Sequence, residues 1–238
     1  MPDEIDEIDE VRHALQTPRA AAIAGIAFAV MLGVSIALMR ASIPAEPSDA
    51  GEWLTDAGRR RAFSLALNLI PFAGIAFLWF IGVVRTRIGD AEDRFFASVF
   101  LGSGLLFLAM LFATAAIAGG IVETGSAASG SPDPEVWEFG RRTTYTLTNV
   151  YAMRMAAVFI ISTTTIGLRV AILPRWLVVF GFASAVLLLI GSSAVPWLTM
   201  AFPTWVLVLS AHILVTDLRS GAGEDGLSAR RPRTDGTD

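Results

Sequence analysis

The sequence predicts an all-α fold: a polytopic membrane helix bundle with six transmembrane helices. Of the 238 residues, 54% are apolar. They are pooled into long uncharged runs, whereas a soluble fold spreads its apolar residues at a periodic spacing. The charged residues occupy the short gaps between these runs, and a hydrocarbon core about 30 Å thick needs roughly 20 apolar residues per helix. Each run is expected to be helical, because a helix satisfies its own backbone hydrogen bonds in lipid.

Reading from one charge to the next gives the limits of the spans. Four runs are bounded by charged residues, and a fifth, residues 176–216, is too long for one helix. It is expected to break at residues 191–196, where Gly and Ser precede a proline suited to a helix start. The six expected spans are residues 20–39, 62–84, 95–122, 143–168, 176–191 and 196–216.

The two ends of the chain are polar, and residues 20–217 between them form one transmembrane domain. Residues 1–19 carry a cluster of acidic side chains from Asp3 to Glu10. A secretory signal begins with positive charge, so this segment is expected to be an acidic cytoplasmic tail. Residues 218–238 are rich in Gly, Asp and Arg, a composition that predicts a disordered cytoplasmic tail.

The distribution of arginine predicts the orientation. All 18 basic residues are Arg. With the first tail inside, the cytoplasmic side carries Arg12, Arg19, Arg85, Arg87, Arg94, Arg169, Arg175, Arg219, Arg230, Arg231 and Arg233. The opposite side carries the smaller group, Arg40, Arg59, Arg60, Arg61, Arg141 and Arg142. The excess favours cytoplasmic positions for both termini, although the run of three at 59–61 opposes it.

Several kinds of chemistry are excluded or disfavoured. The chain has no cysteine and two histidines, so thiol chemistry is excluded and neither a metal nor another cofactor is expected. The expected spans hold no Asp or Glu, which disfavours a carboxylate proton relay. The net charge of −4 is dispersed and gives no indication of a nucleic-acid partner. An enzyme is the least favoured class, because no span holds a carboxylate pair or a Ser/His arrangement.

Arg154 is the charge that lies inside an expected span, and such a residue marks a functional site unless it has a structural partner. Thr144, Thr148 and Tyr151 share its helix face. Asn68 on the second expected helix and Thr199 and Thr204 on the sixth are expected at a similar depth. They lie near Pro71 and Pro203, each of which leaves a backbone carbonyl without its helical donor. The candidate ligand-binding set is therefore Arg154, Tyr151, Asn68, Thr199 and Thr204.

A guanidinium in such a pocket suits a small anionic or lipid ligand on the outward-facing side. There are two alternatives. Arg154 extends along its own helix toward the headgroups, or it pairs structurally with Glu123 or Glu138.

The first expected helix carries a stripe of small residues at every fourth position: Ala21, Gly25, Ala29 and Gly33. Small residues at this spacing let a second helix approach closely. The second helix belongs either to a neighbouring part of the same chain or to a partner, in a homo-oligomer or with another membrane protein.

Short segments resemble uncharacterised six-helix membrane proteins of bacteria, which are grouped as domains of unknown function. These segments are Asn149–Arg154, Leu173–Trp176 and Glu92–Phe96. The resemblance extends over roughly residues 20–216 and implies a helix bundle in the bacterial cytoplasmic (inner) membrane. It implies no activity.

Two functional classes therefore remain. The first is a protein that binds or transports a small anionic or lipid ligand through the pocket at Arg154. The second is a non-catalytic membrane subunit or scaffold that packs against a partner protein. Membrane lipids are expected to surround either one.

Overall fold

The structure is a computed structural model that describes residues 18–42, 56–88, 94–127, 134–192 and 195–228. Almost all of these residues are helical, and none of them lies in a β-strand. The prediction of an all-helical chain is confirmed. The N-terminal segment expected as an acidic tail lies outside the described residues up to residue 17.

The helices follow the uncharged runs of the sequence. In chain order they are α2 (Pro18–Ser42), α3 (Ala57–Ile88), α4 (Arg94–Ala127), α5 (Pro134–Thr146), α6 (Met153–Arg169), α7 (Arg175–Gly191) and α8 (Ala201–Ser228). A π-helix, η3 (Leu147–Ala152), joins α5 to α6, and a 3₁₀-helix, η4 (Pro196–Met200), leads into α8. The long run 176–216 is interrupted between Gly191 and Pro196, as the Gly/Ser turn and the proline predict.

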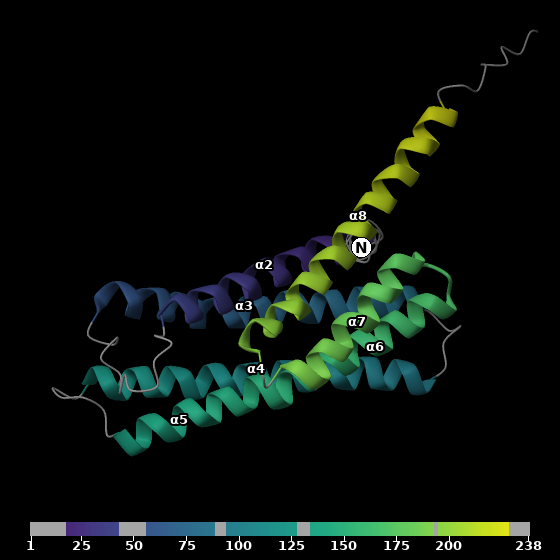
Figure 1. The fold of residues 1–238 in the computed structure, drawn as a ribbon. Helices are drawn as coiled ribbons and strands as arrows, with labels where there is room; N and C mark the ends of the chain where they lie inside the picture. Colours follow the sequence, from purple (N-terminus) through teal and green to yellow (C-terminus); the bar gives the residue numbers. More distant parts are fainter. Residues whose placement is uncertain (1–17, 43–55, 89–93, 128–133, 193–194, 229–238) are drawn as a thin grey trace, which may run out of the picture.

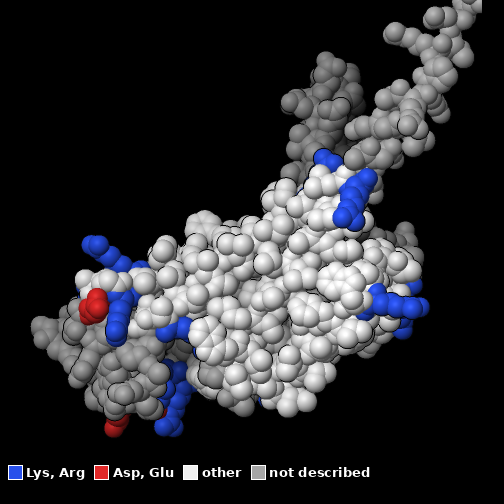
Figure 2. All heavy atoms as spheres, turned by 45° about the horizontal axis from the view of Figure 1, so that its top comes forward, with Lys and Arg blue, Asp and Glu red and all other residues white. Residues whose placement is uncertain are grey.

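In the described part of the chain, five helical segments are long and apolar enough to cross a membrane: 19–42, 57–85, 95–123, 135–169 and 197–219. The remaining apolar helix, α7, is shorter, with 17 residues. Figure 2 shows a broad surface without charged side chains between charged groups that gather toward the ends. Length, composition and charge distribution are thus those of a multi-pass membrane protein.

The helices lie side by side (Figure 1), and an aromatic core fills the space between them. Helix α2 packs against α3 and α8, α4 packs against α6, and α6 packs against α7. Phe77 of α3 lies at the centre of the core, with ring centroids 4.4 Å from Phe28 of α2, 5.6 Å from Phe107 of α4 and 5.1 Å from Phe159 of α6. Offset and edge-to-face ring pairs stabilise such a cluster beyond simple burial. The cluster therefore ties together helices that are distant in sequence.

Helices α3 and α4 run antiparallel in a defined register. Ile81 lies opposite Gly104, where an added Cβ would come within 2.7 Å of its Cδ1 atom. Two turns farther along, Gly74 lies against Phe112, and two turns beyond that, Leu67 lies opposite Gly119, at 3.7 Å from an added Cβ. These steps, of seven residues on α3 and of eight and seven on α4, fix which residues face one another at the end where α3 begins and α4 ends.

The turn between α6 and α7 ends the helix with a Schellman arrangement. Ile172 N donates to Gly167 O and Ala171 N to Leu168 O, at 3.0 and 3.2 Å. Ala171 has φ 55°, the left-handed conformation in which this motif usually has glycine. The hydrogen bonds to the last carbonyls of α6 thus hold Ala171 in a left-handed backbone conformation that is unfavourable for a residue other than glycine.

Helix α8 continues to Ser228, so residues 218–228 are helical where the sequence predicted the start of a disordered tail. Extending a formed helix adds one hydrogen bond per residue without a new nucleation step, which offsets the poor composition of this segment. The last part of α8 projects away from the other helices (Figure 1). Residues 229–238 of the predicted tail lie outside the described part.

Candidate functional site

The structure distributes the predicted ligand-binding residues over three places. Arg154 is half-buried, and its Nη1 atom donates to the carbonyl oxygen of Val150 on the same helix, at 2.8 Å. Tyr151 is 55% exposed, so its side chain lies on the surface. Thr204 is exposed on α8. These side chains do not close around a shared cavity.

Thr199 is buried and is engaged by a different arginine. Its Oγ1 atom accepts a hydrogen bond from Arg40 Nη2 at 3.1 Å. The Arg40 guanidinium also lies over the Trp197 ring, 5.2 Å from the centroid, in a cation–π arrangement. These two contacts connect the end of α2 to η4, so Thr199 lies at an interface between two helices.

The π-helix explains the hydrogen bond of Arg154. A π-turn inserts a residue into the helix, and Met153 N consequently donates to Thr148 O, five residues back. Side chains donate to the two carbonyls that follow: Ser192 Oγ to Asn149 O at 2.7 Å, and Arg154 Nη1 to Val150 O. Arg154 and Ser192 thus help to satisfy the backbone of an irregular turn.

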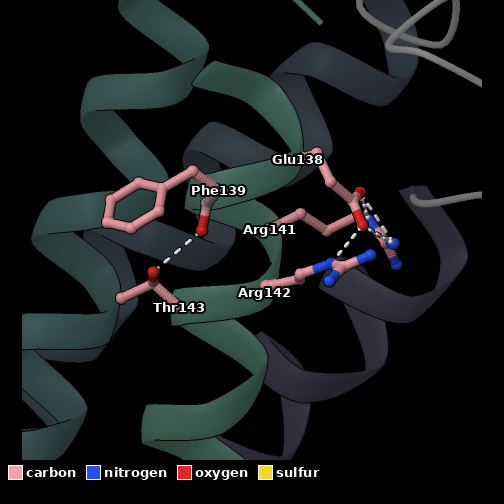
Figure 3. A network of polar contacts seen from close by, with 5 residues as sticks. All are labelled: Glu138, Phe139, Arg141, Arg142 and Thr143. Atoms are coloured by element: carbon pink, nitrogen blue, oxygen red, sulfur yellow. Dashed lines mark hydrogen bonds and ion pairs between the residues drawn. The ribbon is translucent and has the colours of Figure 1, made fainter. Parts of the chain in front are cut away.

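The two acidic residues considered as partners of Arg154 lie elsewhere. Glu138 of α5 pairs with Arg141, with Nε–Oε2 at 2.9 Å, and with Arg142 one turn along the same helix. Figure 3 shows both guanidinium groups turned toward the Glu138 carboxylate, while Thr143 donates to the Phe139 carbonyl. Glu123 lies at the rim of a groove on α4.

That groove is the strongest candidate site in the described part of the chain. It lies between α3 and α4, at the end where α3 begins, and encloses about 680 Å³, within the usual range of ligand pockets. Its apolar lining consists of Leu67, Ile70, Pro71, Phe112, Ala115, Ala116, Gly119, Gly120 and Val122. Its polar lining consists of Ser64, Asn68 and Glu123.

The sequence of the two helices accounts for the groove. Small residues at Ala115, Ala116, Gly119 and Gly120 leave space on α4, and an added Cβ at Gly120 would meet no atom within 4 Å. On α3, Pro71 lacks the backbone N–H that would donate to the carbonyl of Leu67. An apolar trough therefore carries Ser64 and Glu123 at one end, Asn68 midway along it, and a backbone acceptor that lacks its usual helical donor.

A second, smaller apolar cluster lies next to the groove and shares Val122 with its lining. Phe63 of α3 and Ala118 and Val122 of α4 are buried together, with Trp137 of α5 packed against them. On the other side Asn68, Pro71 and Glu123 are exposed. Among the described residues, the groove is thus accessible along these three side chains.

Sequence reasoning identified part of this site and missed part. It singled out Asn68 and Pro71, but grouped them with Arg154 instead of with α4. It considered Glu123 only as a structural partner of Arg154. The small residues Ala115, Ala116, Gly119 and Gly120 were the available signal, because small side chains on one face of a long apolar helix leave either a close contact or a groove.

The stripe of small residues on α2 lies inside the chain over most of its length. Ala21 and Ala29 are buried at 1% and 5% exposure. An added Cβ at Gly25 would clash with Ser210 of α8 and lie 2.9 Å from a ring atom of Phe80 on α3, whereas one at Gly33 would meet nothing within 4 Å. The first three positions thus serve contacts within the chain.

The chain matches no protein-family model, and comparisons with curated proteins and with solved structures give no match.

Proposed function

We propose that this protein is a six-span membrane protein of a bacterial inner membrane that binds a lipid in the groove between α3 and α4. The observation that carries the proposal is the groove itself: an apolar trough of about 680 Å³ with Ser64 and Glu123 at one end and Asn68 midway along it. An acyl chain fits apolar walls, and a headgroup needs polar partners at the end of such a trough.

Five long apolar helices support the membrane location. The sixth crossing is α7, whose 17 residues extend about 26 Å at the rise of an α-helix, close to the thickness of a hydrocarbon core. The excess of arginine on one side supports cytoplasmic termini. This orientation places the polar end of the groove at the outer side of the membrane.

Reporter fusions test this topology. Fusions after Arg219 and in the 85–94 segment are expected to report the cytoplasm, and a fusion near Gly130 the opposite side. The reverse pattern would move the groove to the inner leaflet and contradict the proposed orientation.

Lipid binding is favoured over a scaffold role because the small residues that suit a partner helix are used within the chain. Ala21 and Ala29 are buried, and Gly25 lies against α3 and α8. The groove, by contrast, is open. Gly33 is the position of the stripe with open space beside it, and it is therefore the position at which a second copy or a protein partner could pack.

Photocrosslinking tests the proposal. The protein is reconstituted in vesicles that contain a phospholipid with a photoreactive acyl chain, and the adducts are mapped by mass spectrometry. Adducts are expected to concentrate in residues 64–71 and 112–123 relative to other exposed apolar segments. An even distribution over all exposed apolar segments would contradict a lipid site.

A matched pair of glycine variants controls this experiment. Gly120 and Gly102 both lie on α4, and at each an added Cβ meets no atom within 4 Å, but only Gly120 lines the groove. Gly120→Leu is expected to lower the groove adducts several-fold by filling the trough. Gly102→Leu is expected to leave them unchanged.

A further inference from the structure

The groove carries a negative charge, whereas the site expected from the sequence was built around the positive charge of Arg154. Glu123 is the charged residue in the groove lining, and it is exposed at the rim. In the part of the chain that the structure describes, its carboxylate makes no hydrogen bond or ion pair. The other polar residues of the lining are Ser64, with its hydroxyl, and Asn68, with its amide. This end of the groove offers a negative charge and neutral hydrogen-bonding groups.

A carboxylate without a cationic partner attracts a positive group and repels an anionic one, most strongly where apolar walls limit access of water. A lipid whose only headgroup charge is a phosphate would place like charges together at Glu123. An ammonium group with N–H donors would instead form a charge-assisted hydrogen bond with this carboxylate.

Arginine lies beside the same end of the groove. Arg61 is exposed and lies one turn before Ser64 on α3, on the helix face that continues to Asn68. Arg59, by contrast, lies near Asp56, with Nε–Oδ2 at 3.8 Å. A phosphate held beyond the rim on the Arg61 side and an ammonium held at Glu123 would match the two charges of a zwitterionic headgroup.

We infer that the groove selects a phospholipid whose headgroup carries an ammonium group, with Glu123 as the residue that recognises it. The inference rests on the proposed lipid site and adds the headgroup class to it. Glu123 accepts hydrogen bonds from the ammonium group, Asn68 and Ser64 complete its polar surroundings, and the acyl chain lies along Leu67, Phe112 and Ala115.

The test compares photoreactive phospholipids that have identical acyl chains and different headgroups: phosphoethanolamine, phosphocholine and phosphoglycerol. In the folded full-length protein in vesicles, phosphoethanolamine is expected to label residues 64–71 and 112–123 about three- to five-fold more than phosphoglycerol, the ratio that one partly exposed ion pair supports. Phosphocholine is expected to lie between them, because its quaternary ammonium has the charge but no N–H donor.

Variants of Glu123 isolate its contribution. Glu123→Gln keeps the shape of the side chain and is expected to abolish the headgroup preference, whereas Glu123→Asp keeps the charge and is expected to retain most of it. Glu135→Gln removes an exposed acid of α5 that lies outside the groove lining, and it is expected to retain the full preference. Thermal unfolding of each variant in the same vesicles checks that the fold is intact.

The outcomes separate the two proposals. Equal labelling of the groove by all three lipids, a preference for phosphoglycerol, or a preference that survives Glu123→Gln would overturn the ammonium selectivity while leaving the lipid site standing. Absence of groove adducts with every headgroup would overturn the lipid site itself.

Discussion

The two halves of α3 lie in different surroundings. After Pro71, α3 is packed into the aromatic core, where Phe77 contacts rings from α2, α4, α6 and α8. Before Pro71, α3 contacts α2, for example through the hydrogen bond from Ser35 Oγ to Ala66 O at 2.9 Å. Its other face, with Asn68, lines the groove.

The difference originates on α4. Opposite the packed half of α3, α4 presents the large buried side chains Phe107, Leu108 and Leu111. Opposite the open half it presents the small residues Ala115, Ala116, Gly119 and Gly120. The antiparallel register is continuous through both halves. Side-chain volume on α4 therefore decides which half of α3 is closed and which is open, and the following predictions test that contrast.

The largest expected effect lies in the closed half. Phe77→Ala would remove the central ring of the aromatic core and is expected to lower the free energy of unfolding by about 3–5 kcal/mol. Phe72→Ala, on the same helix at 62% exposure, is expected to change it by less than about 0.5 kcal/mol. Thermal unfolding in matched detergent micelles measures both variants. Equal losses would show that α3 has no preferentially packed face.

The contact between α2 and its neighbours gives the next effect. Gly25→Leu would force a side chain against Ser210 and Phe80 and is expected to cost about 1–3 kcal/mol, as overpacking does. Gly33→Leu has open space and is expected to leave stability and particle size in detergent unchanged. A change of particle size caused by Gly33→Leu would instead indicate a partner helix at that position.

A smaller effect is expected at the π-turn, which lies away from both halves of α3. Ser192→Ala would remove the donor to the Asn149 carbonyl and is expected to cost about 1 kcal/mol. Ser184→Ala removes the hydroxyl of a buried residue for which the described residues show no hydrogen bond, and it serves as the matched control. Calorimetric unfolding of both variants in the same detergent is the measurement, and equal stabilities would contradict a structural role for Ser192.

The smallest effect on stability is expected in the open half. Asn68 is exposed in the groove, so Asn68→Leu is expected to change the unfolding free energy by less than about 0.5 kcal/mol. The same variant is expected to alter lipid crosslinking at residues 112–123. A large loss of stability without any change in crosslinking would assign Asn68 to packing and not to the groove.

The sequence predicted the helices well because charges and Gly/Pro signals mark their limits. Gly191 and Pro196 bound the break before the last helix for reasons local to the chain. Which face of each helix is buried is less predictable from the sequence, because it depends on which other helices pack against it. Gly25 and Gly33 belong to one regular stripe, yet only Gly25 lies against other helices.

The candidate site shows the same limit. Depth along a span placed Asn68 and Arg154 together, but depth does not determine direction around the helix axis. Arg154 instead donates to Val150 beside a π-turn, and a single inserted residue of this kind leaves no periodic signal in the sequence.

Because Pro71 lies within α3, the width of the groove depends on the bend angle of α3 at this proline. The part of α3 before this proline, residues 57–70, forms an arm about 21 Å long at the rise of an α-helix, and prolines are the usual points at which helices bend. A rotation of about 5° at Pro71 displaces the far end of that arm by roughly 2 Å, while atoms beside the proline barely move. Ser64 lies only about 10 Å from Pro71 along the helix, so the same rotation would move it by roughly 1 Å. The polar end of the groove, at Ser64 and Glu123, would open or narrow by about that distance while the aromatic core on the other side of Pro71 stays in place.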